Sequence, residues 1–189
     1  MVHSLALIVS SLLLASIARA DLQFTPKIVE YELDGVKFKH LTFSDGGAKE
    51  ITYSPPRGWD YSRSANQLTL HPPNKSQAEA TISKVGLSQP ASFDDETVKK
   101  LVDEALASVP ERSTDIQLTS QKKNPVMIQR KETLLLTLTY NFYGQSYSRS
   151  LLFLNRGKEQ IRFQLSCHQS DFKELQKAFL GSQYSWQNL

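Results

Sequence analysis

The chain has 189 residues, of which 40% are hydrophobic and 10% aromatic, and a formal net charge of +3 at pH 7. This composition is that of a globular domain and excludes a disordered chain. The weak charge argues against strongly polyanionic partners, so no nucleic acid is expected.

The first 20 residues are typical of a secretory signal peptide. Leu5 to Ile17 is almost entirely apolar or small, and Ala18 to Ala20 offers a small-x-small cleavage site. The run is shorter than the roughly 20 apolar residues that span a bilayer. No Lys or Arg precedes it, so an uncleaved anchor is the alternative. We predict export to the periplasm or outside the cell, a single domain over 21–189, and no transmembrane segment after cleavage.

Short strands separated by turns dominate the first half. Asp34-Gly35 suits a type I′ turn and predicts a hairpin between 27–33 and 36–43. The sequence does not decide whether this N-terminal hairpin (21–44) joins the main sheet or forms a small lobe. The segment from Pro55 to Trp59 breaks the strand pattern. Further strands are predicted at 49–54, 60–64, 67–71 and 77–85, with turns at 44–47 and 65–66.

Residues 94–109 predict an amphipathic helix that Pro110 ends. Ser92 or Asp94 can cap its first turn. Its apolar residues fall on one stripe, which requires the helix to lie on a sheet. They are Val98, Leu101, Val102, Ala105, Leu106 and Val109.

The second half alternates strongly between apolar and polar residues. Alternation of this kind predicts an antiparallel sheet with one apolar and one more polar face. It also places the single cysteine, Cys167, in the core. The predicted strands are 113–121, 131–142, 146–155 and 159–167, with a break at 122–125. A helix over 170–180, capped by Ser170 or Asp171, covers the apolar face.

Three parts of this pattern carry a family resemblance. They are the turn Tyr53–Trp59, the helix at 94–109, and the terminal strands and helix that close with Ser185-Trp186. Together they resemble the PsbP-like (Mog/PsbP) α/β superfamily, in its small exported bacterial branch. The resemblance implies an α+β fold: an antiparallel β-sheet flanked by helices on both faces (an α/β/α sandwich), with an additional N-terminal β-hairpin.

The same resemblance implies accessory, assembly and binding proteins. The superfamily includes photosystem II extrinsic subunits and a Ran-binding nuclear factor. It has no family-wide active site, so no catalytic residue is carried over to this chain.

No motif in the sequence indicates catalysis, a cofactor or a metal. The chain lacks Gly-x-Ser-x-Gly, His-x-x-His, Cys-x-x-Cys and a glycine-rich loop before a helix. Cys167 and His168 are neighbours on a strand, so their side chains point to opposite faces and should not pair. We predict a non-enzymatic protein without cofactor or metal. The alternative is a hydrolase whose site combines Ser146, His168 and Asp171.

Aromatic residues beside arginine indicate a recognition surface. Arg57, Trp59 and Tyr61 lie around the proline turn, and Tyr143 and Tyr147 flank a predicted hairpin tip. We predict a binding or assembly module that recognises a protein partner or a small ligand. A structural subunit of an envelope complex is a further alternative.

Overall fold

The protein is described by a computed structural model that covers residues 26–44, 50–64 and 67–188. The predicted signal peptide and the turns predicted around 45–47 and 65–66 lie outside the described residues. Within these ranges, neither helix is long and apolar enough to cross a membrane.

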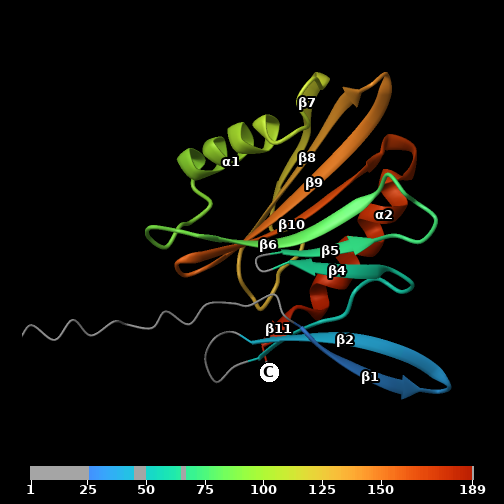
Figure 1. The fold of residues 1–189 in the computed structure, drawn as a ribbon. Coiled ribbons are helices and arrows are strands. Elements are labelled where there is room, and N and C mark those ends of the chain that lie inside the picture. Colours follow the sequence, from blue (N-terminus) through green and yellow to red (C-terminus); the bar gives the residue numbers. More distant parts are fainter. Residues whose placement is uncertain (1–25, 45–49, 65–66, 189) are drawn as a thin grey trace, which may run out of the picture.

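The strands of the described residues form two antiparallel sheets (Figure 1). The smaller has the order β1-β2-β3-β11, and the larger has the order β4-β5-β6-β10-β9-β8-β7. The smaller sheet contains β1 (Lys27–Leu33), β2 (Val36–Ser44), β3 (Glu50–Tyr53) and β11 (Gln187–Asn188). The larger contains β4 (Asp60–Ser64), β5 (Gln67–His71), β6 (Glu79–Gly86), β7 (Thr114–Lys123), β8 (Thr133–Phe142), β9 (Gln145–Arg156) and β10 (Glu159–His168).

The predicted N-terminal hairpin is present and belongs to the smaller sheet. Its closing pair is Leu33 with Val36, and the two turn residues, Asp34 and Gly35, have φ values of 52° and 76°. Positive φ at both positions is the signature of a type I′ turn. Because β1 and β2 pair within the smaller sheet, the hairpin lies outside the main sheet. This answers the question that the sequence left open.

The two helices are α1 (Asp95–Ala107) and α2 (Gln169–Ser182), and a short 3₁₀ helix over Gln183–Ser185 follows α2. Asp94 caps α1 by accepting a hydrogen bond from the Thr97 backbone N–H at 2.8 Å, which lowers the pKa of this carboxyl. The predicted caps of α2 are wrong. The helix begins after His168 without a side-chain cap, and Asp171 instead accepts a hydrogen bond from Lys75 Nζ at 2.7 Å.

The predicted break at 122–125 starts too early. Lys122 and Lys123 continue β7 and pair with Leu135 and Leu134 of β8. Their exposure explains the error, because a polar strand at the edge of a sheet has the composition of a loop. The chain turns only at Asn124, which has a positive φ of 55°.

The prediction of one apolar and one polar face is also wrong. Leu134, Leu136 and Leu138 of β8 belong to the core cluster that contains α1, whereas Phe163 and Leu165 of β10 belong to the cluster that contains α2. The apolar side therefore changes from one face to the other between β8 and β10. The intervening strand β9 is buried continuously from its fourth to its tenth residue, as expected where both faces are covered.

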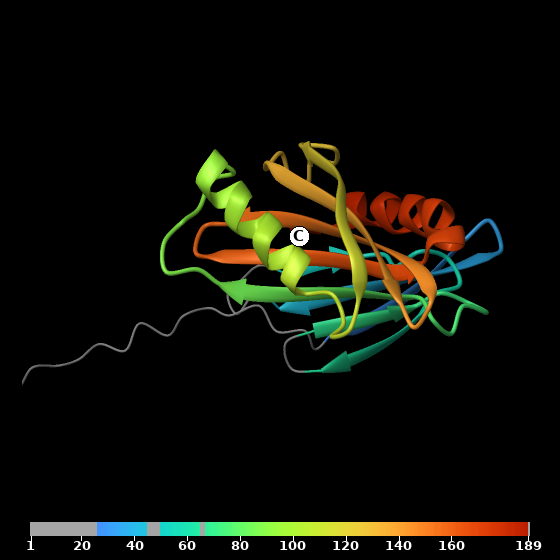
Figure 2. The ribbon, with the colours of Figure 1, turned by 90° about the horizontal axis from the view of Figure 1, so that it is seen from above.

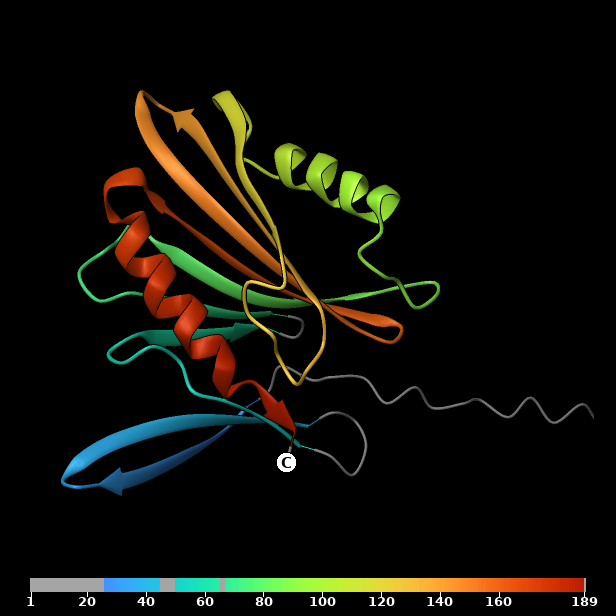
Figure 3. The same cartoon turned by 180° about the vertical axis from the view of Figure 1, so that it is seen from behind.

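The architecture is mostly antiparallel β-sheet with two helices, but the predicted α/β/α sandwich is not confirmed. The core on the α2 side is shared with the smaller sheet. The smaller sheet lies beside the C-terminal end of α2 (Figure 3). Trp186 is fully buried there, with ring centroids 5.7 Å from Phe43 of β2 and 5.3 Å from Phe163 of β10. Seen from above, α1 and α2 lie at well-separated places on the larger sheet (Figure 2).

Candidate recognition groove

The proline turn predicted at Pro55–Trp59 is a tight turn between the two sheets. The Trp59 backbone N–H donates to the Pro56 carbonyl at 3.1 Å, and Gly58 has a φ of +78°. Positive φ is what glycine adopts without strain, so the sequence indicated this turn correctly.

The C-terminal end of α2 and the residues that follow it hold this turn in place. The Ser54 backbone N–H donates to Ser185 Oγ at 2.8 Å, and the Trp59 ring stacks on Phe179 with centroids 6.1 Å apart. Just before the turn, the Tyr53 hydroxyl hydrogen-bonds Ser182 Oγ at 2.8 Å, and burial raises the pKa of Tyr53. These contacts link residues about 130 positions apart and pre-organise the turn.

A hollow of about 380 Å³ opens beside the turn. Its walls are the whole stretch from Ser54 to Tyr61 together with Lys39 and Leu41 of β2. The structure therefore brings the predicted residues Arg57, Trp59 and Tyr61 to one site. Arg57 is exposed, whereas Trp59 and Tyr61 are half-buried.

A second hollow of about 450 Å³ adjoins the first and shares Tyr61 with it. It lies between Pro26 and Ile28 at the start of the smaller sheet and Tyr61 to Arg63 of β4. We call the two hollows together the inter-sheet groove. It has apolar, aromatic and cationic walls, which is the composition of surfaces that bind protein partners.

The other two predicted recognition residues lie elsewhere. Tyr143 is 75% exposed at the tip of the β8–β9 hairpin, and the Tyr147 ring stacks on His168 with centroids 4.5 Å apart. His168 immediately precedes α2, whereas Trp59 contacts Phe179 near its other end. The predicted surface is therefore two separate places at opposite ends of α2.

The residues of the alternative hydrolase site do not form a relay. Ser146 and His168 point to opposite faces of the sheet, because His168 pairs in register with Tyr147, the neighbour of Ser146. Each of the three binds a different partner: Ser146 donates to Asn141, His168 hydrogen-bonds Gln77, and Asp171 accepts from Lys75.

Cys167 lies in the core, as the alternation predicted. The side chain is fully buried, and burial raises the pKa of its thiol to about 12, with the nearby Asp171 carboxylate adding to the effect. His168 faces the other side of β10, where it stacks on Tyr147. A thiol–imidazole pair is therefore absent at these two positions.

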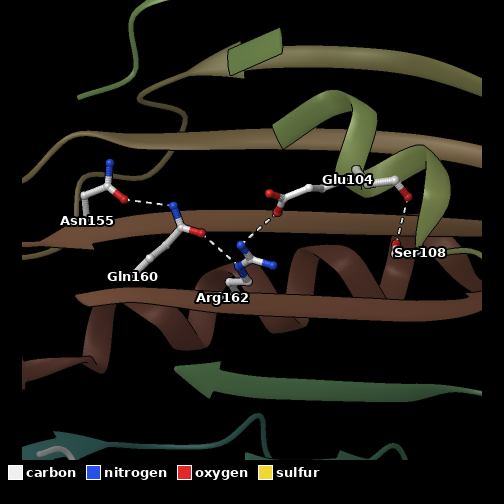
Figure 4. A network of polar contacts seen from close by, with 6 residues as sticks. Glu104, Ser108, Asn155, Gln160 and Arg162 are labelled. Carbon is white, nitrogen blue, oxygen red and sulfur yellow. Dashed lines mark hydrogen bonds and ion pairs between the residues drawn. The ribbon is translucent and has the colours of Figure 1, made fainter. Parts of the chain in front are cut away.

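A polar cleft, which the sequence did not predict, lies beside α1 on the larger sheet. Its volume is about 280 Å³, and polar side chains of β5, β6 and β10 form its floor. Gln160 Nε2 donates to Asn155 Oδ1 at 3.0 Å, and Gln160 Oε1 accepts from Arg162 Nε at 2.8 Å (Figure 4). Arg162 Nη2 then donates to Glu104 of α1 at 3.0 Å. The alternating polar residues of β10 are visible in the sequence and could have indicated a polar surface. The sequence does not show that α1 lies over this surface.

Arg149 bonds Ser108, which lines this cleft at the C-terminal end of α1. It is 7% exposed, and it donates to Ser166 Oγ at 2.8 Å and to the Ser108 carbonyl at 2.6 Å. Burial lowers the pKa of Arg149, and no carboxylate pairs with it within the described residues. The guanidinium also lies over the Tyr140 ring, 5.6 Å from its centroid. Arg149 thus fixes the end of α1 on the sheet.

The described ranges bring together no group of three His, Cys, Asp or Glu side chains that could hold a metal ion. The acidic run at Asp94 and Asp95 lies at the start of α1, where Asp94 caps the helix.

Comparison with solved structures identifies the fold. LpqN, involved in cell envelope biogenesis of Mycobacterium tuberculosis, matches with a TM-score of 0.52 and 11% identity over 87% of this chain and 90% of LpqN. The PsbP protein of Synechocystis sp. PCC 6803 (CyanoP) matches with a TM-score of 0.49 and 11% identity over 91% of this chain and 95% of CyanoP. The fold is PsbP-like.

The resemblance inferred from the sequence is therefore confirmed at the level of the fold. A protein of unknown function from Pseudomonas aeruginosa, PA94, a possible regulator by its description, matches with a TM-score of 0.44 and 16% identity over 83% of this chain and 94% of PA94. No protein-family model and no curated protein matches the chain. At these identities a PsbP-like likeness establishes the fold alone.

Proposed function

We propose that the protein is an exported, non-catalytic recognition module that binds a protein partner in the inter-sheet groove. The observation that carries this proposal is the convergence of Arg57, Trp59 and Tyr61 on one pre-organised hollow. A rigid aromatic and cationic surface binds with little loss of conformational entropy, which is the general advantage of pre-organisation. Hydrogen bonding to Ser185, which follows α2, holds the turn in place, so the turn loses little conformational freedom when a partner binds.

The architecture accounts for the position of the groove. We interpret the fold as an elaborated α/β/α sandwich, in which α1 packs on one set of alternate residues of β8 and β9 and α2 packs on the other. The smaller sheet is an addition to this sandwich, and its junction with the larger sheet creates the groove. LpqN, with a related fold, is involved in cell envelope biogenesis. Together with the predicted signal peptide, this supports an envelope location.

Affinity capture from a native envelope extract tests the proposal. The wild type should retain a stoichiometric protein partner, and Arg57→Ala combined with Tyr61→Ala should lose it. Tyr143→Ala is the matched control, since it removes an equally aromatic and more exposed side chain at the other end of α2. Equal capture by the double variant would contradict the proposed site.

A screen of ester and phosphoester substrates tests the non-catalytic part. No turnover above background is expected. Turnover that disappears in His168→Ala, in a variant whose thermal unfolding is unchanged, would establish the hydrolase alternative.

A further inference from the structure

The groove contains the free edge of β4. This strand is the outermost strand of the larger sheet, and it pairs only with β5 within the described residues. Tyr61, Ser62 and Arg63 line the second hollow together. Successive side chains of a strand point to opposite faces, so three consecutive residues can line one hollow only along the strand edge. The groove therefore exposes backbone as well as side chains.

The pairing of β4 with β5 shows which backbone groups are available. Ser64 pairs with Gln67 across a connection of two residues, and such a closing pair exchanges both hydrogen bonds in a tight hairpin. Hydrogen-bonded and non-hydrogen-bonded pairs alternate along an antiparallel ladder. Tyr61 and Arg63 therefore direct their backbone N–H and C=O groups away from β5 and into the groove.

An exposed apolar residue faces this edge. Ile28 of β1 pairs with Leu41, which is fully buried, so Ile28 lies on the inner face of the smaller sheet. Ile28 is nevertheless 53% exposed, and it lines the second hollow together with Tyr61 to Arg63 of β4. A strand placed next to β4 would cover it. An apolar side chain and an unpaired strand edge that line the same hollow are the two elements that strand addition needs.

The charges of the groove select the chemistry of the added strand. Arg57 and Arg63 are exposed and form no ion pair within the described residues, whereas Lys39 is 3.6 Å from Glu30. Asp60 is the acid that lines the groove. Two free guanidinium groups against one carboxylate favour an acidic partner, and guanidinium binds carboxylate through two parallel hydrogen bonds.

We infer that the partner enters the groove as an extended segment that pairs with the free edge of β4. The segment carries an apolar residue that covers Ile28 and acidic residues that reach Arg57 and Arg63. This inference rests on the proposed function and specifies the form of the ligand. A second copy of the chain, joined edge to edge at β4, is the competing occupant.

A peptide library tests the inference with the folded chain. Random 12-residue peptides displayed on phage are selected against the wild type, and the most enriched peptide is synthesised and its Kd measured. We then methylate its backbone nitrogens one position at a time. Strand addition predicts that methylation weakens binding at least 10-fold at alternate positions and little at the positions between them. Weakening without this alternation would overturn strand addition.

Two substitutions at one position provide the matched control on the protein side. Arg63→Gln removes the charge and keeps the backbone N–H, whereas Arg63→Pro removes both. Proline is tolerated at an edge strand where the N–H points outward, so both variants should unfold at similar temperatures. Arg63→Pro should bind the peptide at least 10-fold more weakly than Arg63→Gln. Equal affinities would overturn strand addition.

The remaining outcomes separate this inference from the proposed function. The peptide could bind the double variant Arg57→Ala, Tyr61→Ala more weakly and yet show no alternation on methylation. This result would support the groove as the binding site and overturn strand addition. If that double variant binds the peptide as well as wild type, the proposed site fails too. Sedimentation could instead reveal a concentration-dependent dimer that the Arg63→Pro variant does not form. This result would show that the edge of β4 binds a second copy of the chain, and it would overturn the inference.

Discussion

The inter-sheet groove and the polar cleft beside α1 are both hollows that contain arginine side chains, but the two differ in the partners that these side chains have. In the cleft, Gln160 and Arg162 bond each other and their neighbours, so the polar groups form a connected network. In the groove, Arg57 and Arg63 form no ion pair within the described residues, and the edge of β4 is unpaired there. A connected network of hydrogen bonds stabilises a fold, whereas exposed charges and a strand edge held on a rigid frame remain available to a partner.

The largest expected effect comes from removing the side chain that joins the two sheets. Trp186→Ala should lower the free energy of unfolding by about 3–5 kcal/mol, because it deletes a fully buried ring that contacts both sheets. Chemical denaturation measures this loss. Tyr184→Ala is the control, since its ring is mostly exposed two residues earlier and its loss should cost under about 0.5 kcal/mol. Equal losses of unfolding free energy in the two variants would contradict the role of Trp186 in joining the two sheets.

The network in the cleft should matter for stability and not for binding. Gln160 is 2% exposed, and Gln160→Leu removes the hydrogen bonds that its amide makes to Asn155 and Arg162, which should cost about 1–3 kcal/mol. Gln164→Leu in the same cleft changes a side chain without a hydrogen bond inside the described ranges and should cost under about 0.5 kcal/mol. Both variants should capture the partner as the wild type does. A loss of capture by Gln160→Leu would give the cleft a direct role.

The burial of Cys167 in the core should affect stability at alkaline pH. The pKa of Cys167 is raised from 9.0 to about 12, so the folded state holds a proton that the unfolded chain releases. This contribution is complete below pH 9 and is lost as the pH rises to 12, with a slope of up to about 1.4 kcal/mol per pH unit. The slope of unfolding free energy against pH in this window should be shallower in Cys167→Ala. Identical slopes would mean that Cys167 does not titrate as its burial requires.

Much of the fold could be predicted because strand and turn signals are local. The type I′ turn at Asp34-Gly35, the sharp turn at Gly58 and the helix beginning after Asp94 all follow from a few neighbouring residues. The exchange of the apolar side between β8 and β10 could not be predicted. It depends on the register that aligns Leu135 with Leu152 and Leu152 with Phe163, which no local pattern encodes.

The candidate site could be predicted only in part, for the same reason. Arg57, Trp59 and Tyr61 are close in sequence, and composition alone grouped them. Tyr143 and Tyr147 were grouped with them by residue type, although the length of α2 separates the two places. The approach of Ile28 to β4 joins residues about 34 positions apart and depends on how two sheets pack.

The central claim is that the inter-sheet groove is the binding site of a rigid module. The most direct measurement compares affinity and stability in Arg57→Ala with Tyr61→Ala. Arg57 is exposed, so Arg57→Ala should change the unfolding free energy by under about 0.5 kcal/mol. The half-buried Tyr61 ring packs against the core, so Tyr61→Ala should cost about 1–2 kcal/mol, while partner affinity of the double variant falls at least about 10-fold. Unchanged affinity in a stably folded double variant would contradict the account.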